Sequence, residues 1–110
     1  MIPFFTDTLG LVVRFHLKPG HEHAFDKLTA KTVPHIQEHE PGTLLYMCHN
    51  VAGEPLQRVF YELYANRAAF EAHEAQPHVQ HFLSARAAFV ERFEVDELSP
   101  AAQAATLFKR

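Results

Sequence analysis

The sequence has one cysteine, no cluster of lysine and arginine, and only four scattered glycines. Cys48 cannot form an internal disulfide, so a reducing compartment is expected, and we predict Cys48 to be a small core side chain of a strand. The formal net charge of -3 offers no basic surface to a polyphosphate backbone, and nucleic acid is not expected as a partner. Glycines so far apart build neither a dinucleotide-binding fingerprint nor a phosphate loop.

Long apolar runs are also absent. The start of the chain carries apolar side chains but neither the basic segment nor the long apolar segment of a signal peptide, and no later run reaches membrane-spanning length. We therefore expect a cytoplasmic protein without a membrane partner. With 110 residues, of which 47% are hydrophobic and 21% charged, the chain is predicted to form one globular domain with one core.

The hydrophobic periodicity predicts strands that alternate with helices. Residues 11–17 alternate on two faces, as a strand does, and the segment from Phe25 to Ile36 has the spacing of an amphipathic helix, which Pro34 should kink or restart. The remaining strands are predicted at 44–51, 57–64 and 91–98, and the remaining helices at 67–74 and from Pro77 onward.

This order predicts an α+β, ferredoxin-like (βαββαβ) domain, an antiparallel sheet with its helices on one face. The single domain covers residues 1–110, with its core at about 11–98 and a C-terminal tail at 99–110. The uncovered sheet face is expected to carry Val12, Tyr46, Tyr61 and Leu63. Because an apolar face on a small protein usually meets a partner, we predict a homodimer joined sheet to sheet, a dimeric α/β barrel. The tail would fray or lie on the partner.

One carboxylate and one imidazole interrupt the apolar stretch at 59–83. Glu62 occupies a strand position where an apolar residue is expected, and a buried carboxylate needs a partner. Asn66 can cap the next helix, whose inner face carries Phe70 and His73. His73 is therefore predicted to pair with Glu62. The pair would act as a base with its orienting partner, or as a hydrogen bond that ties the helix to the sheet, and the two roles are compatible.

The nine histidines include pairs at helical spacing, His35 with His39 and His78 with His81. Spacing alone does not make a metal site, which needs three or four convergent ligands with supporting contacts. These pairs lie among polar residues on faces that should be solvated. No metal is expected.

Several short motifs are spread over residues 11–98. They are Lys18-Pro19-Gly20, Glu40-Pro41-Gly42, Tyr61-Glu62-x-Tyr64, Ala68-Ala69-Phe70-Glu71-Ala72-His73, and Pro77-His78 with Phe82. In these motifs the chain resembles the antibiotic biosynthesis monooxygenase family, a dimeric α/β-barrel group that includes small cofactor-independent quinol oxygenases. Members of that superfamily oxygenate aromatic substrates, degrade haem, isomerise small sugar-derived signals, or have no known reaction.

The haem-degrading members resemble one another in an asparagine on strand one, a tryptophan on helix two and an iron-binding histidine beyond it. The matching positions here are Val13, His73 and Leu83, so the resemblance implies no haem. The family's frequent tryptophan after the strand-three glutamate is Tyr64 here, which keeps an aromatic wall and adds a hydroxyl.

The resemblance implies a cofactor-independent monooxygenase that acts with O2 on a small aromatic phenol or hydroquinone. His73, oriented by Glu62, would accept the phenolic proton, while Tyr64 and Arg86 would hold the developing oxyanion. The substrate wall would include Phe70, Phe82 and Val13.

Two alternatives stay open. One is an isomerase-type proton shuttle on a small metabolite, which would use His73 and Glu62 without oxygen. The other is a non-catalytic ligand-binding module, which a collapsed cavity would favour.

Overall fold

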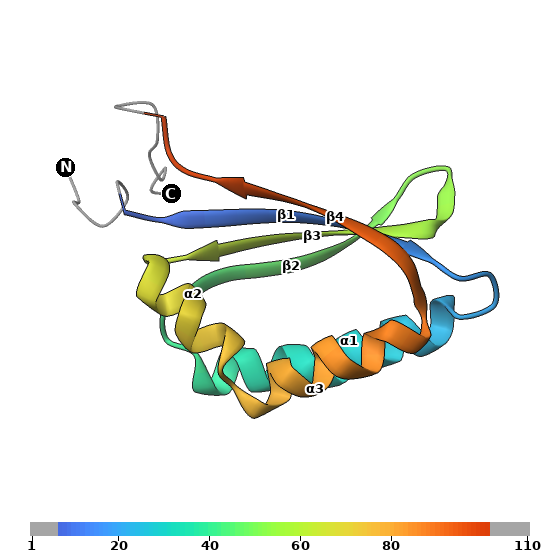
Figure 1. Ribbon diagram of the computed structural model, residues 1–110, viewed down its shortest axis with the longest axis horizontal. Helices are drawn as coiled ribbons and strands as arrows, with labels where there is room; N and C mark the ends of the chain where they lie inside the picture. Colours follow the sequence, from blue (N-terminus) through green and yellow to red (C-terminus); the bar gives the residue numbers. More distant parts are fainter. Residues whose placement is uncertain (1–6, 102–110) are drawn as a thin grey trace, which may run out of the picture.

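A computed structural model describes residues 7–101, so the tail expected at 99–110 lies almost wholly outside the described residues. The strands are β1 (Leu9–Leu17), β2 (Thr43–Val51), β3 (Glu54–Tyr64) and β4 (Val90–Leu98). The helices are α1 (Glu22–His39), α2 (Arg67–Glu74) and α3 (Pro77–Ala85), and the short 3-10 helix η2 (Arg86–Ala88) follows α3. The antiparallel sheet has the order β2-β3-β1-β4, and the helices lie along one of its faces (Figure 1). The ferredoxin-like prediction is confirmed.

Alternation along β1 builds the core between sheet and helices. Every second side chain of β1 from Leu9 to Leu17 is buried, as the period of two requires. Phe15 lies at the centre, with its ring centroid 4.8 Å from that of Phe60 and 5.1 Å from that of Phe25. These packed rings hold the sheet and α1 together.

Helix α1 runs through Pro34 as one element, so the predicted restart is wrong. Proline removes one intrahelical hydrogen bond, but the residues on either side of it share one buried face. Phe25, Leu28 and Ile36 keep both halves of α1 against the sheet. Within residues 7–101, no helix is long and apolar enough to cross a membrane.

Helix α2 begins against the start of β2. The side chain of Asn66 caps α2, as predicted, by accepting a hydrogen bond of 2.8 Å from the backbone N–H of Ala69. The chain at Gly42 passes so close to α2 that a Cβ on Gly42 would lie 2.6 Å from the Cβ of Ala69. This approach requires glycine.

The sheet face away from the helices, here called the bare face, carries a set of apolar side chains. The strand register places on it Val12, Leu45, Met47, Tyr61 and Leu63. Tyr46 was expected there but pairs with Glu62 on the helix side, because the register shifts between Thr43 and Leu45. A slip of one residue turns every following side chain to the other face. Cys48, expected in the core, is exposed on the edge strand β2.

Candidate functional site

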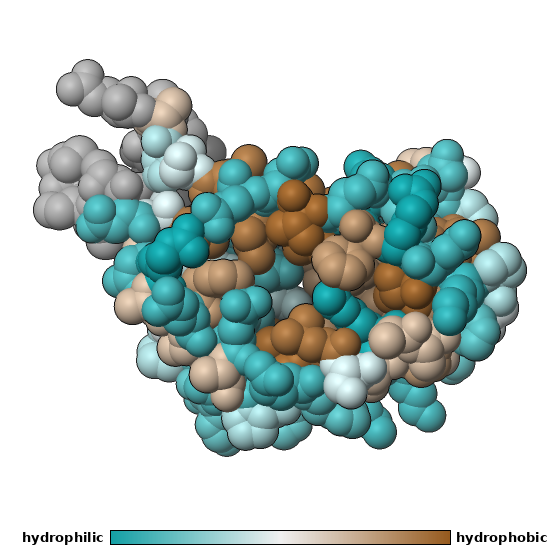
Figure 2. All heavy atoms as spheres, in the orientation of Figure 1, coloured by the Kyte–Doolittle hydropathy of each residue, from teal (hydrophilic) through white to brown (hydrophobic). Residues whose placement is uncertain are grey.

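A cavity of about 490 Å³ opens between β4 and the helices α2 and α3. Figure 2 shows apolar atoms gathered around this hollow. Its apolar wall includes Leu11, Val13, Phe15, Phe70, Val79 and Phe82, and its polar groups include Tyr46, Glu62, His73, Glu74, Arg86 and Glu97. An apolar pocket with a few convergent polar groups is the usual form of a small-molecule site.

Glu62 enters the cavity from the middle of β3. It pairs with Leu11 of β1 and Tyr46 of β2, which places it on the helix side of the sheet, and it is 5% exposed. Burial raises the pKa of this carboxyl to about 7, although the hydrogen bond from Tyr64 and the charge of Arg86 oppose the rise. Glu62 can therefore hold or release a proton near neutral pH.

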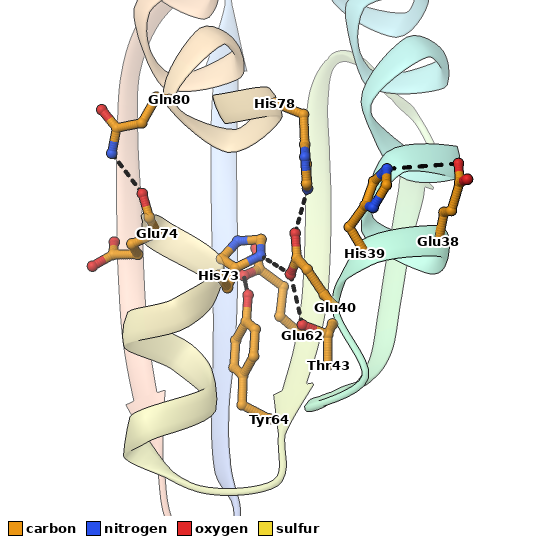
Figure 3. Close-up of polar contacts among 10 residues, drawn as sticks. All are labelled: Glu38, His39, Glu40, Thr43, Glu62, Tyr64, His73, Glu74, His78 and Gln80. Carbon is orange, nitrogen blue, oxygen red and sulfur yellow. Dashed lines mark hydrogen bonds and ion pairs between the residues drawn. The ribbon is translucent and has the colours of Figure 1, made fainter. Parts of the chain in front are cut away.

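Tyr64 stands behind Glu62 and not in the cavity wall. Its hydroxyl donates a hydrogen bond of 2.5 Å to Oε1 of Glu62, and its side chain is completely buried (Figure 3). Burial, together with the neighbouring carboxylate, raises its pKa above the ordinary value. The structure thus places Tyr64 where it supports Glu62, away from the substrate contact expected of it.

Tyr46 is the wall tyrosine that the sequence did not single out. Its ring centroid lies 5.6 Å from that of His73, and its side chain lines the cavity. Burial, followed by the charge of Glu62, raises its pKa well above the ordinary value, so Tyr46 keeps its proton and can donate a hydrogen bond. The feature that would identify Tyr46 as a cavity residue is the register of the β2–β3 hairpin, which places Tyr46 opposite Glu62.

The partner of His73 is Glu40, which corrects the predicted pairing with Glu62. His73 Nδ1 lies 2.6 Å from Glu40 Oε1, and His78 Nε2 lies 2.5 Å from Glu40 Oε2 (Figure 3). Thr43 donates a further hydrogen bond of 2.8 Å to Oε1. Because a carboxylate only accepts, both imidazoles donate to Glu40. With Nδ1 of His73 directed at Glu40, Nε2 is the ring nitrogen left to face a ligand.

Arg86 supplies a cation to the same cavity. Its guanidinium carbon lies 4.5 Å from the ring centroid of Phe93 and 5.4 Å from that of Phe15. Burial lowers its pKa below the ordinary value. Within residues 7–101 no carboxylate forms an ion pair with Arg86, so its charge can meet an anionic ligand oxygen.

The structure brings six of the seven predicted site residues to one cavity. Lining it are His73, Glu62, Arg86, Phe70, Phe82 and Val13. Over residues 7–101, no group of three or more histidine, cysteine, aspartate or glutamate side chains is arranged to hold a metal ion. The cavity brings together the imidazole of His73, the titratable carboxyl of Glu62 and the cation of Arg86. This combination suits proton removal from a flat apolar ligand.

Comparisons with known proteins find solved structures that are similar to this chain. A structure from Shewanella oneidensis is 26% identical, with a TM-score of 0.80 over 86% of this chain and 92% of that one. Two structures described as candidate antibiotic biosynthesis monooxygenases have TM-scores of 0.82. The one from Bacteroides thetaiotaomicron is 19% identical, over 93% of this chain and 97% of that one. The one from Caulobacter crescentus is 20% identical, over 88% and 92%.

A search of curated proteins finds no match. The sequence itself matches the family described as antibiotic biosynthesis monooxygenase over residues 8–85, which is more than half of the 110 residues. That match covers β1 through α3 and so includes every polar group described above except Arg86 and Glu97. The chain belongs to the antibiotic biosynthesis monooxygenase family.

Proposed function

We propose that this protein is a cofactor-independent monooxygenase that acts on a small aromatic phenol or hydroquinone. Membership of the family supports a monooxygenase-like function. The observation that carries the finer proposal is the cavity of about 490 Å³, in which His73 and Arg86 share one apolar pocket. Such a pocket accepts a flat ring and provides a base for its hydroxyl and a cation for the resulting oxygen anion.

In the proposed mechanism the substrate itself supplies the electrons that reduce O2. His73 Nε2 takes the phenolic proton, and Arg86 pairs with the phenolate oxygen, where a charge-assisted hydrogen bond is strongest. The electron-rich anion transfers an electron to O2, and the oxygen adds to a ring carbon. One oxygen atom stays on that carbon as a carbonyl. The other leaves as water, which contains the hydroxyl hydrogen of the phenol and the hydrogen displaced from the attacked ring carbon. Phenol plus O2 therefore gives quinone plus water, with no external reductant.

Glu62 and Tyr46 complete the site. Glu62 can return a proton to the departing oxygen, because its pKa of about 7 leaves a protonated fraction at neutral pH. Tyr46 keeps its hydroxyl proton and can donate a hydrogen bond to the substrate oxygen. The phenylalanine walls exclude water from the reacting anion. Tyr64 acts through Glu62 as a positioning residue.

The test is oxygen uptake by the purified protein with a panel of hydroquinones and naphthols, in the presence of a chelator. Uptake should saturate with substrate and fall by about 100-fold or more in His73→Asn, since general-base catalysis is worth about that factor. His81→Asn is the matched control, because His81 lies on α3 away from the cavity. Full uptake by folded His73→Asn, or uptake equal to autoxidation in all samples, would reject the proposal.

The second candidate is a non-oxidative proton shuttle on a small metabolite. It is favoured by the presence of two proton-transfer groups, His73 and Glu62, on one cavity. Anaerobic turnover of a ketone or aldehyde isomer would separate it from the oxygenase. A purely structural pocket is less favoured, since the cavity is open and not filled with side chains.

We also propose that the bare face joins two copies of the chain. Its apolar side chains form a continuous patch across β1, β2 and β3, and Met47 is 47% exposed. A second copy offers the same patch, and a two-fold pairing would bury both. A cytoplasmic location remains part of the proposal, on the strength of the single unpaired cysteine.

A further inference from the structure

A second hollow, of about 560 Å³, lies between α1 and α3, and we call it the histidine groove. Its wall includes Lys31, His35 and His39 of α1 and His78 of α3. Among residues 7–101, no carboxylate side chain lines it. The whole chain has a net charge of -3, so this gathering of basic side chains is a local feature. A hollow walled by basic groups attracts anions.

The imidazole rings of the groove lie in a row. The ring centroid of His35 is 6.2 Å from that of His39 and 5.7 Å from that of His78, and the corresponding planes are inclined by 12° and 23°. Figure 3 shows that His39 and His78 come from neighbouring helices. Ring donors about 6 Å apart can bond two oxygens of one phosphate group, since each N–H···O hydrogen bond spans about 2.9 Å.

The side chains that α1 contributes have donors to spare. Among residues 7–101, neither the ammonium of Lys31 nor the ring of His35 forms a hydrogen bond or an ion pair. His39 has one charged neighbour, Glu38, whose carboxylate lies 3.7 Å from its Nε2 and is 72% exposed. An anion in the groove would therefore replace water at these donors and would not have to break an internal contact.

The first turn of α3 adds to the same field. Helix α3 begins at Pro77 after Gln76, and both residues line the groove. The amino end of a helix carries a partial positive charge, which favours a bound anion. His78 directs Nε2 at Glu40, so Nδ1 is the ring nitrogen left for a ligand. Glu40 itself accepts on both oxygens, is 4% exposed and is not part of the groove wall.

We propose that the histidine groove binds a phosphate group, carried by a small monoester or free in solution. Lys31 supplies a full positive charge, and His35 and His39 supply ring donors from the same helix. A phosphate group offers more charge and more acceptor oxygens than a carboxylate, and so uses all three. A groove of about 560 Å³ also has room for the rest of a small monoester.

The site is separate from the reaction proposed above. The groove and the reaction cavity share no lining residue, so either can exist without the other. Failure of the oxygenase proposal would leave the phosphate site untouched, and the reverse is also true.

Isothermal titration calorimetry at low salt and about pH 6.5, where imidazole is partly charged, measures the binding. The probes are inorganic phosphate and glycerol 3-phosphate, with glycerol and acetate as comparisons. Both phosphates should bind saturably and glycerol should not bind. Acetate should bind at least about tenfold more weakly, because it lacks one charge-assisted hydrogen bond or more.

Lys31→Met combined with His35→Asn removes two groove donors and should weaken the binding of both phosphates by at least about tenfold. Both side chains are exposed, so the core is unchanged, and thermal melting checks the fold. Lys27→Met combined with His23→Asn is the matched control. It removes the same two kinds of side chain from exposed positions of α1 outside the groove, and it should bind as the unmodified protein does.

Glu38→Gln tests the site in the opposite direction. It removes the carboxylate beside His39 and should tighten phosphate binding by about two- to fivefold, the usual effect of one exposed charge. A gain in affinity cannot come from partial unfolding, so this variant remains informative even if the double variant is unstable.

The outcomes decide both the site and its ligand. Absence of saturable phosphate binding, an equal loss in the control double variant, or acetate binding as tightly as phosphate would overturn the proposal. A loss confined to the groove variant, with a gain in Glu38→Gln, supports it. Tighter binding of glycerol 3-phosphate identifies the ligand as a monoester, whereas tighter binding of inorganic phosphate identifies it as the free ion.

Discussion

Tyr64 donates its hydroxyl to Oε1 of Glu62 across 2.5 Å, from two residues further along β3. Residues two apart on a strand share a face, so the pair lies on the helix side of the sheet. The tyrosine is completely buried while Glu62 reaches the cavity. One side chain therefore reaches the cavity, and the hydrogen bond from the other lowers the pKa of the first against the larger effect of burial.

The stability of the protein should fall as pH rises through the titration of Glu62. Burial raises the pKa of this carboxyl from 4.5 to about 7. Between these values the folded state holds the proton that the unfolded state has lost, so the stabilisation present at low pH disappears as pH passes about 7. The loss should reach at most about 3 kcal/mol, at about 1.4 kcal/mol for each pH unit.

Urea unfolding at about pH 5 and about pH 8 measures this loss, with Glu62→Gln as the comparison, since its amide cannot ionise. The variant should show a clearly smaller decrease in the free energy of unfolding over that interval. An equal decrease in the two proteins would show that other groups cause it.

Tyr64→Phe should lower stability with little effect on substrate affinity. The change removes the donor to Glu62, and an ionised buried carboxylate without that donor costs about 1–3 kcal/mol. The cost should be larger above neutral pH, where Glu62 is ionised, than below it. Steady-state kinetics should give an unchanged KM, whereas Tyr46→Phe, in the cavity wall, should raise KM. A rise of about tenfold or more in Tyr64→Phe would place Tyr64 on the substrate.

Arg86→Met should weaken the binding of phenolates by about 10- to 100-fold, because it removes a charge-assisted hydrogen bond worth about 1.5–3 kcal/mol. Arg86→Lys should restore only part of the affinity, since the ammonium lacks the planar fork that lies over Phe93. Fluorescence titration with para-nitrophenolate gives the dissociation constants. Equal affinity of all three proteins would mean that the phenolate oxygen does not meet Arg86.

Met47→Glu should convert the proposed dimer into a monomer. A carboxylate within the apolar patch of the bare face would be buried without a partner on both copies of a two-fold pair. Gln37→Glu, on the exposed side of α1, is the control for the one added negative charge. Sedimentation velocity over a range of protein concentrations measures the mass. A monomer in the unmodified protein, or a dimer in folded Met47→Glu, contradicts the bare face as the interface.

The fold could be predicted because short-range patterns in the sequence determine its strands and helices. The alternation in β1, the helical spacing from Phe25 to Ile36 and the Asn66 cap each depend on neighbours in the sequence, and the structure agrees with all three. The walls of the cavity follow from the same patterns, because a residue on the inner face of a strand or helix must meet the opposite layer.

The pairing within the site was not predictable in the same way. Glu40 meets His73 across 33 positions of sequence, and its place directly before Pro41 and Gly42 gives no local sign of that contact. Tyr46 was missed because a local irregularity in β2 decides its face, and an irregularity of that kind leaves no periodic signal. Both errors concern register and long-range contact, which a single sequence does not encode locally.

The close approach of Gly42 and Ala69 also fixes the spacing between the segments that carry Glu40 and His73. Gly42 follows Glu40 by two residues, and Ala69 precedes His73 by four, which is about one helical turn. The clearance between these two backbones therefore sets the height of α2 above the chain that carries the carboxylate. A side chain at position 42 would push α2 away at Ala69, and we expect it to lengthen the 2.6 Å separation of His73 Nδ1 from Glu40 Oε1. A residue without a side chain thus leaves room for the helix that brings His73 to Glu40.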